Sequence, residues 1–247
     1  FDFGTSFNYK QPVADILWDK ALNSMILAII AVPLGILLGL VGGVVASAFR
    51  GKHLDSILTS SSMVIYAIPT FWLAMIFLLY FGVKWRLVPI NGMITAGVDY
   101  ASWGAYFKDL IWHMIIPAIS YALAIFGGYF LIMRSAMIDV FTEDFVLTAR
   151  AKGLTRKKII AKHVVPNALL PVSTMVITSL ALMFTGAFSI EVLFSWPGMG
   201  RLMVDSVTRQ DYPVMQATNY IVALVVIFAN FVVDILYSYL DPRVRVE

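Results

Sequence analysis

The sequence has no cysteine and little charge. The absence of cysteine excludes disulfide bonds and thiol chemistry. Only 13% of the 247 residues are charged, whereas 60% are hydrophobic. A soluble domain of this length cannot bury so much apolar surface, so the composition predicts an integral membrane protein. The net charge of +3 is small, and the basic residues gather in particular loops, which argues against a nucleic-acid partner.

The sequence also lacks the motifs of common nucleotide-binding and catalytic sites. The stretch nearest to a phosphate-binding loop, residues 50–53, lacks the required glycine spacing, so we expect no ATP binding by this chain. There is no His-Glu-x-x-His or Gly-x-Ser-x-Gly pattern. His53, His113 and His163 are too scattered to suggest a metal site. We therefore predict no catalytic, cofactor-binding or metal-binding residue, and no enzyme.

Five apolar runs are each long enough to cross a bilayer as a helix, which takes roughly 20 residues. They comprise about residues 21–49, 57–81, 111–133, 167–190 and 214–240. The first four runs contain no Asp, Glu, Lys or Arg, and all are too long for barrel strands. The sequence therefore predicts an all-α membrane protein with a transmembrane domain over residues 21–240, preceded by a segment of residues 1–20.

Glycine and proline mark features within these runs. Three glycines form a stripe at every fourth position of the first run: Gly35, Gly39 and Gly43. Such a stripe predicts that a neighbouring helix approaches closely. Three runs are interrupted by a proline, namely Pro33, Pro69 and Pro117. Kinks at these prolines are tolerated in a membrane where neighbouring groups satisfy the freed carbonyls.

The basic residues divide unequally between two sets of loops. Eleven of the 18 Lys and Arg lie in residues 50–56, 134–163 and 241–247. The other seven lie in residues 1–20, 82–110 and 191–213. The positive-inside rule places the first set, with the tail 241–247, in the cytoplasm, and the second set, with residues 1–20, outside. Because residues 1–20 lack the features of a signal peptide, we expect a further transmembrane helix to precede them.

The densest charge lies in the loop 134–166, where residues 134–163 hold seven of the Lys and Arg. The pattern predicts two short helices, the first from about Ile138 to Lys152. Gly153 suits the left-handed position that ends a helix, and Thr155 can cap the second helix. Pro166, which has no backbone donor, marks the start of the next apolar run. A simpler interpretation, a basic surface held at anionic lipid headgroups, stays open on composition alone.

The spacing within this loop resembles the cytoplasmic signature loop of ABC importer permeases. In that family the loop reads Glu-Ala-Ala, three residues, Gly, nine residues, then Ile-x-Leu-Pro. Gly153 and Pro166 are thirteen apart, as the pattern requires, but Leu147 replaces the glutamate and His163 the isoleucine. The form TARAKGL resembles the peptide-importer branch, which often lacks that glutamate. The resemblance implies an ATPase-coupling loop formed by Thr148, Ala149, Arg150, Ala151, Lys152, Gly153, Leu154 and Pro166.

Four other segments resemble the B-type permease subunit of dipeptide and oligopeptide ABC importers. They are DFGTSF (residues 2–7), FSWPGMGRL (194–202), RQDYPVMQ (209–216) and VDILYSYLDPRVR (233–245). Together with the charged loop they cover nearly the whole chain in the family's order. The resemblance implies the fold of a type I ABC importer permease, a helical bundle that shows five transmembrane helices here. In the family, a first helix and an exported segment precede the DFGTSF-like stretch.

The resemblance also implies partners and a location. It implies a pathway for di- or oligopeptides formed with a second, C-type permease subunit. Two ATPase subunits, which hold ATP and Mg, and an external substrate-binding protein would complete the importer. We expect a multi-pass protein of a prokaryotic cell membrane (inner or plasma membrane), surrounded by lipid and with a cytoplasmic C-terminus. Nickel chelates, glutathione or oligosaccharides remain alternative substrates, because selectivity rests largely on the binding protein.

Polar residues in the last apolar run suggest a second class of transporter. They are Gln216, Asn219, Asn230 and Asp234. They can line a polar pathway or bond neighbouring helices. An intramembrane acid such as Asp234 can serve a proton relay, but we favour a structural role because it lies close to the cytoplasmic end. An ion-coupled secondary transporter should show charges at mid-depth and inverted repeats, and the sequence shows neither.

Overall fold

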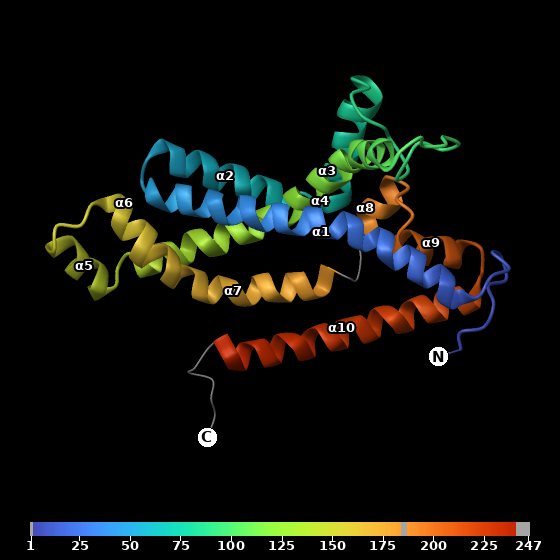
Figure 1. Cartoon of the computed structure of the whole chain (residues 1–247). Helices are drawn as coiled ribbons and strands as arrows, with labels where there is room; N and C mark the ends of the chain where they lie inside the picture. Colours follow the sequence, from blue (N-terminus) through green and yellow to red (C-terminus); the bar gives the residue numbers. More distant parts are fainter. Residues whose placement is uncertain (1, 184–186, 241–247) are drawn as a thin grey trace. The chain divides into compact units, whose positions relative to one another are not determined.

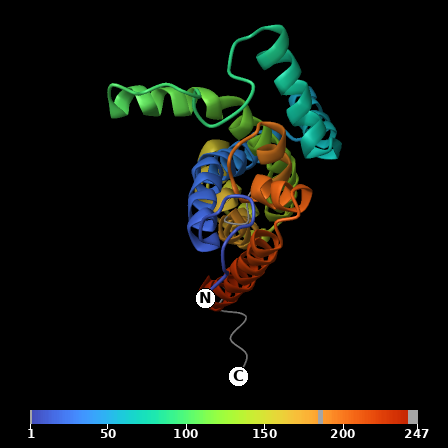
Figure 2. The same cartoon turned by 90° about the vertical axis from the view of Figure 1, so that its right-hand side faces the viewer.

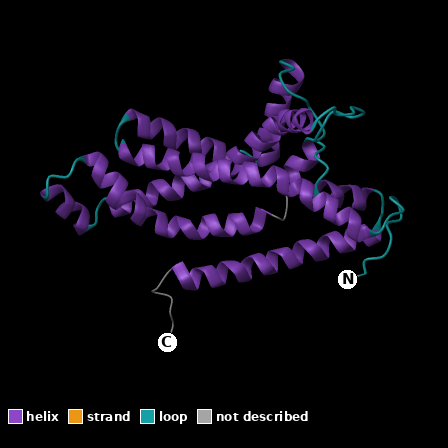
Figure 3. Cartoon of the chain, viewed as in Figure 1, coloured by secondary structure: helices purple, strands orange, loops and turns teal. Residues whose placement is uncertain are grey.

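The computed structural model describes residues 2–183 and 187–240, without the side chains of residues 181, 234 and 236–240. The predicted all-α class is confirmed over this part of the chain, where the only β-type pairing is an isolated bridge between Thr5 and Pro12 (Figure 3). In chain order the elements are α1 (Val13–Ala48), α2 (His53–Ala67), α3 (Thr70–Phe77), the π-helix η1 (Leu78–Lys84), α4 (Trp103–Val140), α5 (Asp144–Ala151), α6 (Arg156–Ile159), the π-helix η2 (Ile160–Val164), α7 (Val165–Leu182), α8 (Phe188–Leu193), α9 (Met199–Thr208) and α10 (Tyr212–Leu240) (Figure 1).

These elements form two compact units. The first unit comprises Phe1–Val32, Pro69–Tyr121 and Leu180–Glu247, and the second comprises Pro33–Ile68 and Ala122–Ser179. The long helices α1 and α4 each contribute one part to each unit.

The described residues contain four helical segments long and apolar enough to cross a membrane. They are Val13–Ala48, Trp103–Val140, Arg156–Leu180 and Tyr212–Val233. A fifth candidate is the pair His53–Ala67 and Thr70–Lys84, which is bent by 102°. The bend follows from Pro69, because a residue before proline avoids the helical region and Ile68 is extended, with φ −76° and ψ 127°. Pro33, in contrast, lies inside a continuous helix.

Helix packing in the second unit depends on the predicted glycine stripe of α1, which is confirmed. A Cβ at Gly39 would lie 2.5 Å from the Cβ of Tyr129, and one at Gly43 would lie 2.8 Å from the carbonyl O of Phe130. Because these glycines have no side chain, the backbone of α1 packs directly against α4 along this stretch. Both helices run in the same direction here, because successive glycines of α1 meet successively later residues of α4.

A bidentate ion pair joins α2 to α4 in the same unit. The Nε and Nη2 atoms of Arg134 lie 2.8 and 2.9 Å from the Oδ1 and Oδ2 atoms of Asp55. The Asp55 side chain is buried. Its oxygens also accept hydrogen bonds from the Thr59 hydroxyl and the Gly51 backbone. The carboxylate therefore has partners for both oxygens, as a buried charge requires.

The core of the first unit surrounds α8 and α9. Trp196 and Phe194 are fully buried in a cluster with Leu27 of α1 and Met114 of α4. A second cluster packs Leu202 of α9 against α1 and the first turns of α10. Both views show α8 and α9 beside the N-terminal half of α1 (Figures 1 and 2). Residues 191–213, expected to be a loop, therefore contain helices, because their aromatic side chains find apolar partners elsewhere in this unit.

Candidate functional site

The charged turn of the second unit differs from the prediction in its first helix. Helix α4 continues to Val140, so Ile138 belongs to the long helix, and residues 141–143 separate it from α5. Helix α5 ends as expected at Gly153, whose φ is +76°. The Gly153 N–H donates to the carbonyl O of Arg150 at 2.9 Å, and the Leu154 N–H donates to that of Ala149 at 3.3 Å. This pair of bonds is a Schellman motif, which satisfies two carbonyls at the helix end.

The second helix of the turn is short and continues without a break into a membrane span. Thr155 occupies the predicted N-cap position of α6, but its side chain makes no capping hydrogen bond. From α6 the chain passes through η2 into α7, with Pro166 in the first turn of α7. Because these helices are continuous, Pro166 is an interior residue that donates no backbone hydrogen bond, and it lies two residues after the π-helical turn η2, where the hydrogen-bond pattern is already irregular. The turn is thereby attached rigidly to the helix that follows it.

Helix α5 has one buried and one exposed face. Val146 and Ala149 are buried, and they lie three residues apart, as neighbours on one helix face do. Leu147 and Thr148 are exposed, and Leu147 is 54% exposed despite being apolar. Phe145 is also 40% exposed, so α5 leaves two apolar side chains uncovered in the described part of the chain.

Sequence reasoning missed a fully buried carboxylate, that of Glu191 in the first unit. Its Oε1 accepts a hydrogen bond from the Ser24 hydroxyl of α1 at 2.7 Å. Its Oε2 accepts one from the N–H of Gly200 at 2.7 Å, in the first turn of α9. Burial raises the pKa of the Glu191 carboxyl, and these hydrogen bonds oppose the rise. The carboxylate therefore joins α1 and α8 to the N-terminus of α9, where a negative charge is favourable.

The two glycines of the FSWPGMGRL stretch allow this arrangement. A Cβ at Gly198 would lie 2.4 Å from the Oε2 atom of Glu191, and one at Gly200 would lie 2.6 Å from the Cα of Phe188. The tryptophan of the same stretch donates its Nε1–H to the carbonyl O of Asn23 in α1 at 2.8 Å. Only a residue without a side chain fits either glycine position at this packing distance.

A second buried carboxylate, Asp211, holds the N-terminal segment to the start of α10. It accepts hydrogen bonds from the Ser6 hydroxyl and from the N–H groups of Phe7 and Asn8. Burial alone would raise the pKa of Asp211, but these hydrogen bonds outweigh it, so the pKa is lowered. Two family-like segments, DFGTSF and RQDYPVMQ, are thus brought together by one side chain.

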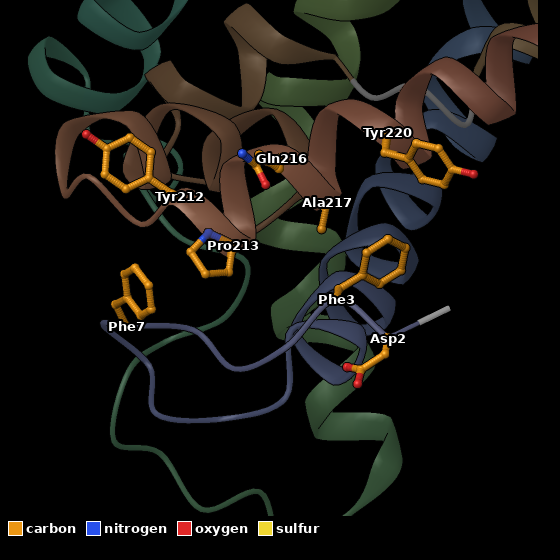
Figure 4. Close-up of a pocket in the computed structure, with 8 residues that line it drawn as sticks. All are labelled: Asp2, Phe3, Phe7, Tyr212, Pro213, Gln216, Ala217 and Tyr220. Atoms are coloured by element: carbon orange, nitrogen blue, oxygen red, sulfur yellow. The ribbon is translucent and has the colours of Figure 1, made fainter.

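A cavity of about 530 Å³ lies beside this contact (Figure 4). It is lined by Asp2, Phe3, Phe7, Tyr212, Pro213, Gln216, Ala217 and Tyr220. Gln216, one of the predicted polar residues of the last run, therefore faces a cavity. Asn219 and Asn230 are exposed, and they share a face of α10 because eleven residues make close to three turns. The side chain of Asp234 lies outside the described residues.

Comparison with known families decides the class. The profile of the family described as "binding-protein-dependent transport system inner membrane component" matches residues 31–246. The chain belongs to this family. It is a permease subunit, embedded in a membrane by its apolar helices, and not an enzyme. Importers of this class combine permease subunits with ATPase and binding-protein subunits.

Curated relatives share about a third of the permease's residues. The dipeptide transport system permease protein DppB of Escherichia coli (strain K12) is 34% identical over 260 aligned residues, which cover 99% of this chain and 77% of that protein. The oligopeptide transport system permease protein AppB of Bacillus subtilis (strain 168) is 34% identical, covering 99% and 76%. The glutathione transport system permease protein GsiC of Escherichia coli (strain K12) is 32% identical, covering 99% and 75%.

Solved structures of transporters share the fold of the permease. A chain of the MetNI methionine ABC transporter, in an inward-facing conformation, superposes with a TM-score of 0.71 at 14% identity, over 92% of this chain and 96% of that one. A chain of an amino acid ABC transporter with histidines gives a TM-score of 0.64 at 15% identity, over 92% and 94%. The type I ABC importer permease fold expected from the sequence is therefore confirmed.

Proposed function

We propose that this permease, together with a second, C-type permease subunit, forms the membrane pathway of an ATP-driven importer for di- or oligopeptides. The observation that carries the proposal is the 34% identity to a dipeptide permease over 99% of the chain. The stretches that resemble the family extend beyond the charged turn to DFGTSF and FSWPGMGRL, which hold buried contacts of the first unit.

The turn at Gly153 is the proposed ATPase-coupling site. Its residues are Thr148, Ala149, Arg150, Ala151, Lys152, Gly153 and Leu154, with Pro166 at the start of the following span. Two ATPase subunits would bind ATP and Mg and dock on the exposed face of α5. Because α6 continues into α7, a displacement of the turn would be transmitted directly to a transmembrane helix. Such a lever can switch a pathway between inward-open and outward-open states.

The proposed orientation follows from the loop charges. The turn 134–166 and the tail 241–247 would face the cytoplasm of a prokaryotic cell, and residues 1–20 would face outward. Helices α8 and α9 would then lie on the side where an external binding protein delivers substrate. Single cysteines at Thr155 and Gly97 test this orientation, since the chain has no other cysteine. Labelling of Thr155→Cys in intact cells by an impermeant thiol reagent would reverse the assignment.

Glutathione is the second candidate substrate. It rests on the 32% identity to GsiC over 99% of this chain, a value close to that of the dipeptide permease. The peptide assignment is preferred because the identity to the dipeptide and oligopeptide permeases, 34%, is slightly higher than the 32% identity to GsiC.

Uptake by the reconstituted importer tests the proposed substrate. The permease is co-purified with its gene-neighbour permease, ATPase and binding-protein subunits and placed in vesicles with ATP on the cytoplasmic side. We expect uptake of a labelled dipeptide that requires ATP and every subunit. Competition by unlabelled glutathione that is stronger than that by unlabelled peptides would replace the peptide assignment. Saturable ATP hydrolysis by the isolated permease would contradict the proposal that separate ATPase subunits hydrolyse ATP.

A further inference from the structure

The second unit contains a basic cavity beside the proposed ATPase-coupling turn, and two residues of that turn, Arg150 and Leu154, line it. The cavity measures about 570 Å³ and lies between the end of α1, the link from α4 to α5 and the turn from α5 to α6. Three arginines line it, namely Arg50, Arg150 and Arg156. Ser47 and Thr142 also line it, but their hydroxyl groups already donate to the backbone carbonyls of Gly43 and Asp139.

Among the residues that the structure describes, no carboxylate lines this cavity. Within the described part of the chain, the side chains of Arg50 and Arg150 have no hydrogen bond or ion pair, and Arg156 donates only to the carbonyl O of Ala48. Three guanidinium groups around one cavity repel one another. A bound anion would relieve this repulsion, and guanidinium groups match the oxygens of a phosphate especially well.

The cavity lies where two membrane-crossing helices end. In the second unit α1 and α4 run side by side in the same direction, and they end at Ala48 and Val140. The lining also includes apolar side chains, among them Phe141 and Leu154. A cavity that combines cations with apolar walls at the end of spans fits a lipid, since basic pockets between transmembrane helices bind lipid headgroups.

From these observations we infer that this cavity binds the phosphate group of an anionic phospholipid. The cavity borders the exposed face of α5, because Arg150 is itself exposed and lies three residues after the exposed Leu147, as neighbours on one helix face do. A lipid in the cavity would therefore lie beside a protein docked on that face.

Native mass spectrometry of the purified full-length permease tests the inference. The lipids are phosphatidylglycerol and phosphatidylcholine, which differ in net charge. We expect the permease to retain phosphatidylglycerol preferentially. The double variant Arg50→Gln/Arg150→Gln removes two charges that make no described protein contact, so it should leave folding unchanged. It should weaken retention about 25-fold, since each guanidinium that donates a hydrogen bond to the phosphate in the cavity contributes roughly a fivefold increase in affinity.

The matched control is the double variant Lys157→Gln/Lys158→Gln. It removes the same charge from exposed residues of α6 that do not line the cavity. Retention in the control should fall less than about threefold. An equal loss in both variants, or no preference for the anionic lipid, would overturn the inference. Full displacement of the lipid by millimolar inorganic phosphate would show that the site binds a free anion, which would overturn the assignment to a lipid. Unchanged lipid retention by the Arg50→Gln/Arg150→Gln variant, together with loss of the ATPase subunits when that variant is purified as the assembled importer, would assign the arginines to a protein partner.

Discussion

The buried contact between α8 and α9 gives the most sharply defined perturbation, Gly200→Ala. A Cβ at Gly200 would lie 2.6 Å from the Cα of Phe188, a backbone atom that cannot move independently. Ordinary contacts of this kind lie at about 3.4–4 Å, so the two helices would have to separate by roughly 1 Å. That separation would stretch the 2.7 Å hydrogen bond from the Gly200 N–H to Glu191.

The expected cost follows from two contributions. Overpacking of a filled core costs about 1–3 kcal/mol. Weakening a hydrogen bond to a buried carboxylate costs about 1.5–3 kcal/mol. Alanine gains up to about 1 kcal/mol over glycine within a helix, which offsets part of the loss. We therefore expect a net destabilisation of about 3 kcal/mol, equivalent to a decrease in Tm on the order of 5–10 °C for a chain of this length.

The assay is thermal unfolding of the detergent-purified permease, with Gly104→Ala as the control. Gly104 is also the second residue of its helix, α4, but its Cβ would lie 3.8 Å from the nearest atom, the Oγ of Ser102. The control should therefore be unchanged or slightly more stable. If Gly200→Ala unfolds at the same temperature as Gly104→Ala, the close packing of α8 on α9 is not a determinant of stability.

Two further predictions concern the buried carboxylates. Asp55→Ala leaves Arg134 without its partner and should lower the free energy of unfolding by about 3 kcal/mol. The control, Asp139→Asn, changes an exposed residue of α4 and should lower the free energy of unfolding by less than about 0.5 kcal/mol. Equal Tm values for the two variants would contradict this prediction. Because the pKa of Asp211 is lowered in the folded state, its stabilisation is complete above the ordinary Asp pKa of about 3.9 and is lost as pH falls through the lower folded value. The protection factors for amide exchange at Ser6 and its neighbours should therefore fall below about pH 4 in the native permease, but be low and independent of pH in Asp211→Asn.

The transmembrane helices could be predicted from the sequence because each is encoded locally. An apolar run of sufficient length requires a helix in a bilayer, whatever else the chain does. The stripe formed by Gly35, Gly39 and Gly43 likewise predicted the close approach of α4, because small residues at one helix face have few other uses. The turn at Gly153 was predictable for the same reason, since positive φ is a local property.

The contacts of the first unit could not be predicted because they join distant parts of the chain. Ser24 and Glu191 are 167 residues apart, and nothing local to either residue signals the pairing. The sequence predicted Glu191 to be the first residue of a polar loop, because a carboxylate side chain is usually exposed to solvent. The bend at Pro69 was recognised as a break, but its 102° angle depends on how the two helices pack. The position of a proline in the sequence does not determine how the helices on either side of it pack.

Coupling through the turn at Gly153 is the central claim, and one comparison tests it most directly. Gly153 and Gly51 have nearly the same backbone conformation, with φ of +76° and +78°, and neither has an atom within 4 Å of its Cβ position. Valine at either position therefore imposes a similar strain of about 1–2 kcal/mol, but only Gly153 lies between α5 and α6.

The measurement is substrate uptake together with substrate-stimulated ATP hydrolysis by the reconstituted importer. We predict that Gly153→Val expresses and inserts normally, transports at a small fraction of the native rate and no longer increases ATP hydrolysis in response to substrate, with Gly153→Ala affected less. Gly51→Val should retain most of its transport. Native uptake by Gly153→Val, or an equal loss in Gly51→Val, would contradict the account.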